Sequence, residues 1–302
     1  MRKVLKWIGI VLGGLVGLLV LVAAGLMIYG EATFKPVQKD RPLYEIRADT
    51  SPEGVTRGKY LLESVMGCAG ACHSPQGGPP YTGTYEEIAL GPAVLKFAPP
   101  NLTPDMETGL GSWSDAEIAR AIREGVSRDG RALAMMPAFN YHIMSDEDIA
   151  DVIGYLRSLP PTRNPIPDID GNALGKALVS LELFLPAALG QPITVAQTTP
   201  PKGTIEYGAY LTSIAGCRDC HKPELTGGQV PPGGMIAPDI TASGDLGQWG
   251  STDFLTAFRT GKLPEGRYLS PDMPYIEYGQ MTDEDLLAMF SYLKSLPGKP
   301  AK

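Results

Sequence analysis

The stretch Cys217-Arg218-Asp219-Cys220-His221 decides how the rest of the chain is interpreted. Two cysteines three positions apart, with a histidine directly after the second, form the C-x-x-C-H pattern of covalent haem attachment. The two thiols add to the two vinyl groups of the porphyrin, and one helical turn sets their separation. His221 then lies beneath the ring, where an imidazole nitrogen can ligate the iron. A disulfide, a zinc half-site and a thioredoxin-like pair are the competing interpretations, but no second zinc half-site matches it, so we predict haem.

A stretched copy of this pattern lies in the first half of the chain, at Cys68-Ala69-Gly70-Ala71-Cys72-His73. Three residues separate its cysteines, where the standard pattern has two. A backbone bulge at Gly70 can accommodate the extra residue, because glycine adopts conformations that other residues avoid. A disulfide without haem is the alternative in an oxidising compartment. We predict two covalently bound haem c groups, attached to Cys68 and Cys72 and to Cys217 and Cys220.

Both motifs belong to a sequence repeat that covers residues 52–160 and 203–298, here called the first and second repeats. Several segments recur in the same order in both, and such recurrence is typical of a domain duplication. The matched segments are Gly58-Lys59-Tyr60-Leu61 with Gly208-Ala209-Tyr210-Leu211, Asn101-Leu102-Thr103 with Asp239-Ile240-Thr241, Trp113 with Trp249, Ala121-Ile122-Arg123-Glu124-Gly125 with Ala257-Phe258-Arg259-Thr260-Gly261, Met136-Pro137 with Met273-Pro274, and Met144-Ser145-Asp146-Glu147-Asp148 with Met281-Thr282-Asp283-Glu284-Asp285.

Helix signals dominate both repeats. Ser145 three residues ahead of Asp148 is a capping pattern that starts a helix. Apolar residues then follow at i, i+3, i+4 and i+7 from 149 to 156, and at the same offset from 286 to 293. Both segments end at a Leu-Pro pair, where proline stops a helix. Alternation typical of strands is scarce, so we predict a mostly α fold.

The chain begins with an apolar segment, residues 7–29, that contains no charge and follows Arg2, Lys3 and Lys6. At about 1.5 Å per residue it can span a hydrocarbon core of roughly 30 Å. A cleaved signal peptide is the alternative, with Gly30-Glu31-Ala32 as a weak cleavage signal. We predict a retained transmembrane helix within residues 1–30, with its N-terminus in the cytoplasm. The bulk of the chain then lies in the periplasm or on the outer face, because bacteria attach haem covalently outside the cytoplasmic membrane.

Two connecting segments complete the predicted organisation. Residues 31–51 are polar and proline-bearing, and we expect a tether there. Residues 161–202 form a proline-rich linker that contains one apolar helix face. We expect that helix to pack across the two repeats, with contact to a membrane surface or a partner subunit as the alternative. The residues of this face are Leu174, Leu178, Leu181 and Leu185.

Each iron needs a second axial ligand opposite His73 or His221. All four cysteines are used, and methionine is the remaining soft and neutral donor. Met136 and Met273 occupy matching positions, and the rigid proline after each limits the freedom of its loop. We therefore predict His73 with Met136, and His221 with Met273, as the axial pairs.

Other candidates for the axial position fit the pattern less well. Met144 and Met281 also match each other, but each stands directly before a helix cap, so we expect them in the core. His142, the third histidine, is opposite Gly279, so the duplicated architecture does not require it. If His142 displaced Met136, the first site would become bis-histidine and its potential would fall.

Three segments of the first repeat carry a family resemblance: Asn101-Leu102-Thr103-Pro104-Asp105, the run from Thr108 to Asp115, and Met136-Pro137 followed by Ser145-Asp146-Glu147-Asp148. Both repeats resemble class I c-type cytochrome domains. Over about residues 53–298 they are similar to membrane-bound cytochrome c subunits that accept electrons from periplasmic alcohol, aldehyde and gluconate dehydrogenases. Those relatives commonly carry three haems, whereas this chain has two motifs. The resemblance implies two tandem cytochrome c domains, with Trp113, Trp249, Asn101 and Thr103 near the haem propionates.

Two closed iron sites on one anchored chain indicate a carrier of single electrons and not an enzyme. We expect a relay from a dehydrogenase or quinol-oxidising complex to a terminal oxidase, a reaction centre or a soluble carrier. The alternative is a peroxidase-like dihaem enzyme with one open haem, for which His142 is the only candidate base. Thiosulfate oxidation of the known type would need a cysteine ligand, and none is free. A net charge of −7 argues against nucleic acid as a partner.

Overall fold

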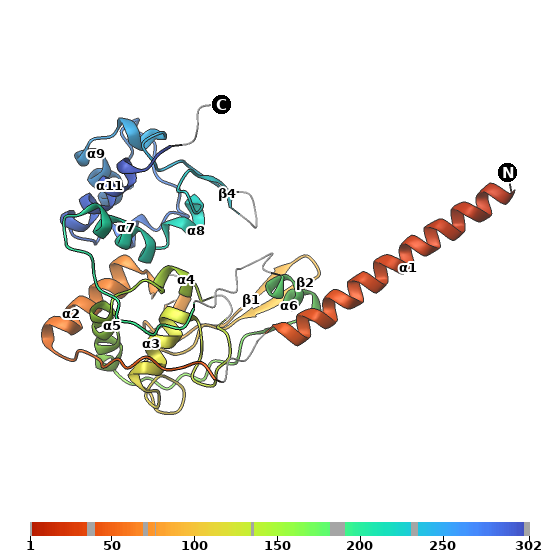
Figure 1. Cartoon of the computed structure of the whole chain (residues 1–302), viewed down its shortest axis with the longest axis horizontal. Coiled ribbons are helices and arrows are strands. Elements are labelled where there is room, and N and C mark those ends of the chain that lie inside the picture. The colour runs from red at the N-terminus through yellow and green to blue at the C-terminus, as the bar shows by residue number, and fades with distance from the viewer. Residues whose placement is uncertain are drawn as a thin grey trace.

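The computed structural model describes residues 2–34, 40–68, 72–75, 77–133, 136–181, 191–230 and 235–298. Its helices form two lobes from which one long helix projects (Figure 1). The helices are α1 (Arg2–Thr33), α2 (Pro52–Tyr60), the π-helical η1 (Leu61–Val65), α3 (Asp115–Glu124), α4 (Ala138–Tyr141), α5 (Asp146–Ser158), α6 (Ala173–Ser180), α7 (Ile205–Ile214), α8 (Cys217–His221), the 3₁₀ turn η3 (Asp245–Gln248), α9 (Ser251–Thr260), α10 (Tyr275–Tyr278) and α11 (Asp283–Ser295). The strands are β1 (Glu86–Leu90), β2 (Ala93–Phe97), β3 (Asp170–Gly171), β4 (Gly228–Val230) and β5 (Met235–Ala237).

The helices of the two repeats follow in the same order. The first helix of each repeat packs against the last, α2 against α5 and α7 against α11. Glycines allow this close approach: a Cβ added to Gly58 would lie 2.0 Å from the Asp151 carbonyl oxygen, and one on Gly208 would lie 2.1 Å from that of Ala288. One apolar core runs through both repeats, with Leu61 and Leu211 fully buried. The predicted mostly α fold is confirmed.

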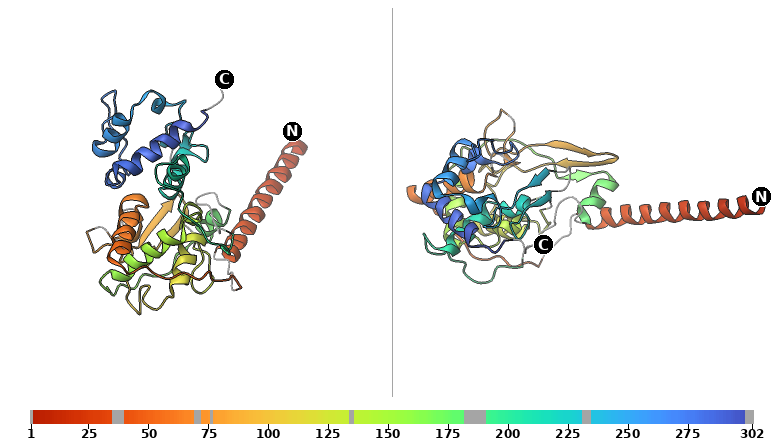
Figure 2. Two further views of the ribbon diagram at one scale, coloured as in Figure 1. Left: turned by 60° about the vertical axis from the view of Figure 1, so that its left-hand side comes forward. Right: turned by 90° about the horizontal axis from the view of Figure 1, so that it is seen from above.

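Helix α1 extends away from the two lobes, as Figure 1 and the view from above in Figure 2 show. Its large apolar side chains are exposed; Leu5, for example, is 66% exposed and Leu21 71%. By length and composition α1 is able to cross a membrane, as an anchor or as a signal sequence. The predicted long apolar helix is therefore confirmed, whereas its retention stays a proposal.

The apolar helix of the linker is α6, and it does not pack as predicted. It lies against α1, β2 and β3 and not across the two repeats. Its buried residues are Gly175, which faces the backbone of Val94 in β2, Ala177, which faces Gly30 of α1, and Val179. Of the predicted leucine face, Leu174 and Leu178 are half-buried, Leu181 is 36% exposed just beyond the helix, and Leu185 lies outside the described residues.

A small antiparallel sheet supports α6, although the sequence showed little strand alternation. Strands β1 and β2 form a hairpin in the register Leu90↔Ala93, and β2 also pairs with β3. Gly91, with a φ of 60°, provides the two-residue turn. Leu95 of β2 packs with Val179 and Phe34 in a second apolar cluster. This cluster attaches the end of α1 to the first lobe.

The part of the predicted tether that the structure describes, residues 40–51, packs along the first repeat. Ile46 is buried there, and the backbone N–H of Ala48 donates to the Asp115 carboxylate over 2.9 Å. The hydroxyl of Tyr44 donates to Asp146 over 2.9 Å. This segment is therefore docked on the lobe.

Candidate haem sites

The C-x-x-C-H stretch of the second repeat forms the short helix α8. Gly216, directly before it, has a φ of 68°, a left-handed conformation that other residues adopt only with strain. Cys217 and Cys220 are half-buried free thiols one helical turn apart. Burial raises the pKa of Cys217 to about 12. The two cysteines therefore lie on one short helix, and the attachment of haem to them stays a prediction.

His221 is held so that one ring nitrogen stays available. Its side chain is 6% exposed, and Nδ1 lies 2.9 Å from the carbonyl oxygen of Pro238. Because a carbonyl oxygen only accepts, Nδ1 carries the proton and Nε2 keeps its lone pair for a metal. Burial lowers the pKa of His221, which favours the neutral form that binds iron.

The first repeat reproduces this arrangement around its stretched motif. His73 is 7% exposed, and its Nδ1 lies 3.0 Å from the carbonyl oxygen of Pro100. Gly67, before the first cysteine, has a φ of 62°. Cys68 and Cys72 are free thiols, while residues 69–71, where a bulge was predicted, lie outside the described residues. The donor set of both repeats fits a covalently bound haem: two thiols and one neutral, oriented imidazole.

The loop after each histidine contains a residue with an unusual backbone conformation. Tyr81 in the first repeat and Leu225 in the second have φ values of 64° and 60°, which are rare for residues with a side chain. The carbonyl of Tyr81 accepts from Leu102 N–H over 2.8 Å, and that of Leu225 accepts from Ile240 N–H over 3.0 Å. These bonds tie the loop to the segment that carries the proline carbonyl.

Asn101 and Thr103 form a closed turn directly after that carbonyl. Asn101 Oδ1 accepts from both the N–H and the hydroxyl of Thr103, over 2.9 and 2.8 Å. In the second repeat, Asp239 Oδ1 accepts the same two bonds from Thr241, over 2.8 and 2.7 Å. The structure thus shows the same turn directly after the proline carbonyl in both repeats, while the predicted contact of these residues with propionates stays a prediction.

Trp113 and Trp249 are half-buried against the core, and a basic residue of each last helix holds their backbone. Arg157 donates to the Trp113 carbonyl over 2.5 Å, and Lys294 donates to that of Trp249 over 3.1 Å. The sequence interpretation missed these two cations. The sequence did offer a signal for them, because Arg157 and Lys294 stand at the same position relative to the Leu-Pro pair that ends each helix.

The candidate methionines occupy matching turns. Pro137 and Pro274 have φ, ψ angles of −79°, 54° and −76°, 53°. The carbonyl of Met136 accepts from Ala138 N–H over 2.8 Å, and that of Met273 accepts from the residue two positions on over 2.7 Å. Each Met-Pro pair therefore forms an inverse γ-turn, which restricts the methionine backbone. Both methionine side chains are half-buried.

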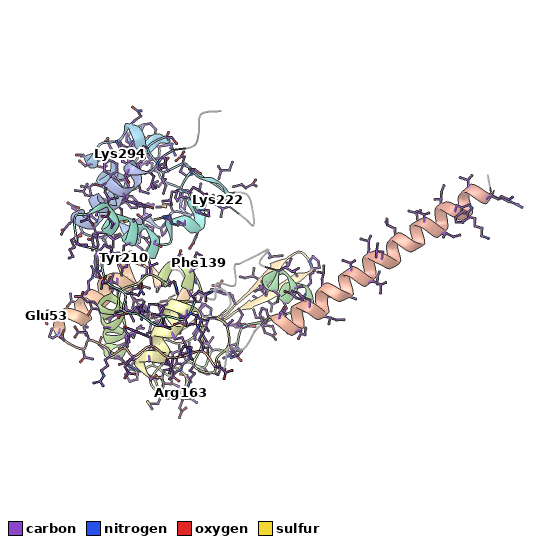
Figure 3. The ribbon with its side chains drawn as sticks, in the orientation of Figure 1. Glu53, Phe139, Arg163, Tyr210, Lys222 and Lys294 are labelled. Carbon is purple, nitrogen blue, oxygen red and sulfur yellow. The ribbon has the colours of Figure 1, made fainter. Side chains whose placement is uncertain are left out.

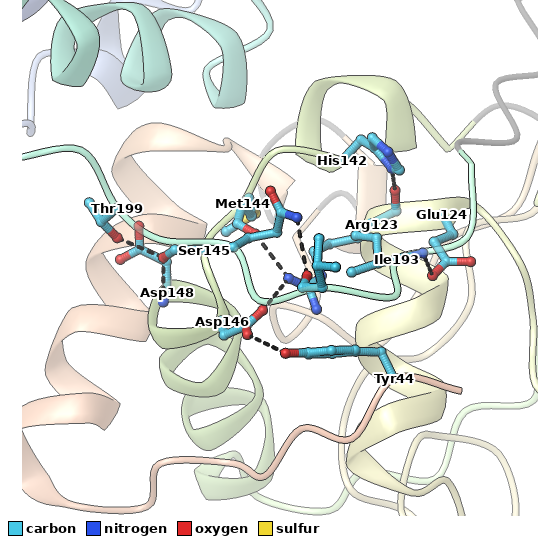
Figure 4. Close-up of polar contacts among 12 residues, drawn as sticks. Tyr44, Arg123, Glu124, His142, Met144, Ser145, Asp146, Asp148, Ile193 and Thr199 are labelled. Carbon is cyan, nitrogen blue, oxygen red and sulfur yellow. Dashed lines mark hydrogen bonds and ion pairs between the residues drawn. The ribbon is translucent and has the colours of Figure 1, made fainter. Parts of the chain in front are cut away.

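The other matched methionines lie in the core: Met144 is 0% exposed and Met281 1%. Arg123 Nη1 donates to the Met144 carbonyl over 3.0 Å and to Asp146 over 2.7 Å (Figure 4). Nδ1 of His142 donates to the Arg123 carbonyl over 3.0 Å (Figure 4). This bond joins the end of α4 to α3 through Nδ1 of His142.

Residues 55–160 match the family model of cytochrome c. This part of the chain therefore belongs to the cytochrome c family, for which haem c is the implied cofactor and electron transfer the implied role. The resemblance inferred from the sequence is confirmed.

Curated relatives extend the likeness through both repeats. The chain is 26% identical over 277 residues to the cytochrome c subunit of alcohol dehydrogenase (quinone) from Gluconobacter oxydans (strain 621H), covering 82% of this chain and 55% of the relative. It is 27% identical over 282 residues to the gluconate 2-dehydrogenase cytochrome c subunit of Pantoea cypripedii, covering 82% and 60%. It is 27% identical over 304 residues to a diheme cytochrome c-type protein of Cereibacter sphaeroides, covering 94% and 97%. The chain thus spans little more than half of each dehydrogenase subunit but nearly all of the last relative.

Proposed function

We propose that the protein is a membrane-anchored dihaem cytochrome c that relays single electrons on the outer face of the cytoplasmic membrane. The observation that carries this proposal is the pair of equivalent histidines. His73 and His221 each follow two free thiols, and each gives its Nδ1 proton to a proline carbonyl. A duplicated and pre-oriented donor set of this kind supports one haem c in each repeat.

Haem iron supplies the electron chemistry, because it cycles between its ferric and ferrous states. Cys68, Cys72, Cys217 and Cys220 would attach the two groups, and the histidines would ligate them from one side. Met136 and Met273 are the proposed ligands on the other side, held by their inverse γ-turns. Two protein ligands per iron leave no coordination position for a substrate, so this arrangement favours a carrier.

The docking of α1 supports a retained anchor. Gly30 is buried against α6, and a Cβ on it would lie 2.5 Å from the Ala177 backbone nitrogen. Nζ of Lys176 donates to Glu31 over 2.7 Å. The weak cleavage signal at residues 30–32 thus lies inside a helix and in a packed contact, so the end of α1 is part of the folded unit. The exposed apolar part of α1 is then free to enter the bilayer.

The relatives support a redox protein as the electron donor. Two of them are named as subunits of alcohol and gluconate dehydrogenases. We propose that this chain accepts electrons from a dehydrogenase or a quinol-oxidising complex and passes them to an oxidase, a reaction centre or a soluble carrier. The alternative, a peroxidase-like enzyme, requires His142 as a distal base. His142 has no counterpart in the second repeat, where Gly279 stands, so the duplicated arrangement favours the carrier.

A redox titration of the purified full-length chain, followed by visible absorption, tests the carrier function. We expect two one-electron transitions and slow binding of carbon monoxide to both ferrous sites, because each iron already has two protein ligands. Rapid carbon monoxide binding at one site would show an open haem and would favour the enzyme instead.

A further inference from the structure

The last helix of each repeat is capped by a tyrosine from the other repeat. In an ordinary capping box, the carboxylate at the third helical position accepts from the N-cap backbone N–H. Helix α3 has this arrangement, with Ser114 N–H donating to Glu117 over 2.8 Å. In α5 the hydroxyl of Tyr210 lies between the two groups: Ser145 N–H donates to it over 3.2 Å, and it donates to Asp148 over 2.6 Å.

A tyrosine of the first repeat caps α11, the last helix of the second repeat, in the same way. The hydroxyl of Tyr60, from the first repeat, accepts from Thr282 N–H over 3.2 Å and donates to Asp285 over 2.5 Å. Tyr60 and Tyr210 occupy matching positions in the two repeats, as do their partner aspartates. The contacts are therefore reciprocal, as expected of two similar units related by an approximate two-fold axis. Tyr210 lies at the level where the two lobes meet (Figure 3).

Both aspartates are buried, at 2% exposure each, and both face the same cation, Arg57. Arg57 Nε lies 3.2 Å from Asp148, and its Nη1 lies 3.9 Å from Asp285. Tyr207 donates a further bond to Asp285 over 2.9 Å. Buried and fully partnered polar groups favour one arrangement of the surfaces that carry them, because any slippage leaves a charge without a partner.

This arrangement brings each attachment motif against the methionine turn of the other repeat. Asn140 of α4 donates to Asp219, inside the C-x-x-C-H stretch, over 2.7 Å. Gly67, next to Cys68, lines a cavity of about 420 Å³ together with Met273 of the second repeat. The contacts thus place the two candidate haem sites on the two sides of one interface.

We infer that Tyr60 and Tyr210 are positioning residues that hold the two haem domains in the single orientation through which electrons pass between them. This inference rests on the proposed function for its electron step, but the locked orientation does not depend on haem. Removing one hydroxyl unlocks the shared interface and therefore loosens both caps. A purely local capping role would loosen only the cap that lost its tyrosine.

Hydrogen exchange resolved at single amides, on the full-length protein in detergent, separates these two outcomes. In Tyr60→Phe we expect the Thr282 amide to exchange roughly five- to tenfold faster, the effect of losing one hydrogen bond. The Ser145 amide, whose own partner Tyr210 is intact, should also exchange faster. Tyr210→Phe should give the mirror result. Unchanged exchange at the distant amide in both variants would overturn the inference.

Tyr155→Phe is the matched control, because it removes a tyrosine–carboxylate bond of 2.7 Å to Glu63 within the first repeat. It should leave the Thr282 and Ser145 amides unchanged. Electron exchange between the two sites, measured after flash reduction, should slow in the double variant Tyr60→Phe/Tyr210→Phe while both midpoint potentials stay constant. An unchanged exchange rate would refute the positioning role.

Haem staining of the same preparations distinguishes the proposed dihaem relay from the inferred locking of the interface by Tyr60 and Tyr210. One haem per chain with coupled caps would refute the proposed relay and leave the locked interface standing. Two haems with uncoupled caps would refute the inference and leave the relay standing.

Discussion

The Nδ1 atom of His221 lies 2.9 Å from the carbonyl oxygen of Pro238, and the next residue, Asp239, accepts from the N–H of Thr241 over 2.8 Å. A backbone partner of this kind sets the tautomer and the orientation of the ring before any metal is bound. The same relationship between His73 and Pro100 shows that the stretched motif ends in an equivalent geometry. The segments that carry these proline carbonyls therefore help to define the two histidine sites, together with the C-x-x-C-H motif.

Asp239→Ala should destabilise the protein, because Thr241 then loses the acceptor of both its N–H and its hydroxyl. We expect a loss of about 1–3 kcal/mol in the free energy of unfolding, measured by chemical denaturation. Asp239→Asn keeps an oxygen at the same place and should lose less than half as much. Equal losses in the two variants would contradict this account of the turn.

Met136→Ala and Met273→Ala should each remove about half of the absorption band that a thioether gives with ferric haem, and should lower one of two potentials. Loss of the thioether removes a ligand that favours the ferrous state. Met144→Ala and Met281→Ala are the controls; both side chains are fully buried, so these changes should cost roughly 2–5 kcal/mol of stability and leave the band. A band that survives Met136→Ala but disappears with Met144→Ala would show that the ligand of the first repeat is misassigned.

The mature protein should keep its own N-terminus and stay in the membrane fraction through high-salt washing. The reason is that Phe34 and Gly30 connect α1 to α6 and the small sheet, so the helix is part of the packed structure. N-terminal sequencing of the purified protein checks this expectation. A soluble product that begins near Thr33 would show that α1 is a signal sequence.

Asp151→Asn should stabilise the protein near pH 7 and have little effect near pH 4. Burial, followed by the charges of Asp148, Asp49 and Glu147, raises the pKa of Asp151 to about 6, while Arg57 opposes the shift. A carboxyl whose native pKa exceeds its unfolded value stabilises the fold at low pH, and that stability is lost as the pH rises through about 6. The variant should gain about 1–2 kcal/mol at pH 7 by chemical denaturation. An equal gain at both pH values would contradict this cause.

The sequence predicted the elements whose signals are local. The capping residue Ser145 begins a helix where expected, and both apolar segments are helices that end at their Leu-Pro pairs. The Met-Pro pairs fall in equivalent turns because proline restricts its own backbone. Histidine orientation was not predictable, because Pro100 and Pro238 contribute a backbone carbonyl that any residue could supply.

Contacts between segments far apart in the chain could not be predicted from the sequence. Tyr60 matched Tyr210 in the repeat, but its bond to Asp285 joins residues 225 positions apart and requires the two lobes to be docked. The buried face of α6 differed from its leucine stripe because Gly30 allows small residues to approach α1 more closely than leucine could. In both cases, tertiary packing decided the outcome and local periodicity did not.

The number of haems per chain tests the central claim most directly. A pyridine haemochrome spectrum of the purified full-length protein, referred to its protein concentration, should give two covalently bound haems, one on Cys68 and Cys72 and one on Cys217 and Cys220. It also reveals whether a vinyl group stays unsaturated at the stretched motif. A value of one, with Cys68 and Cys72 recovered as a disulfide, would contradict the proposal of a dihaem relay.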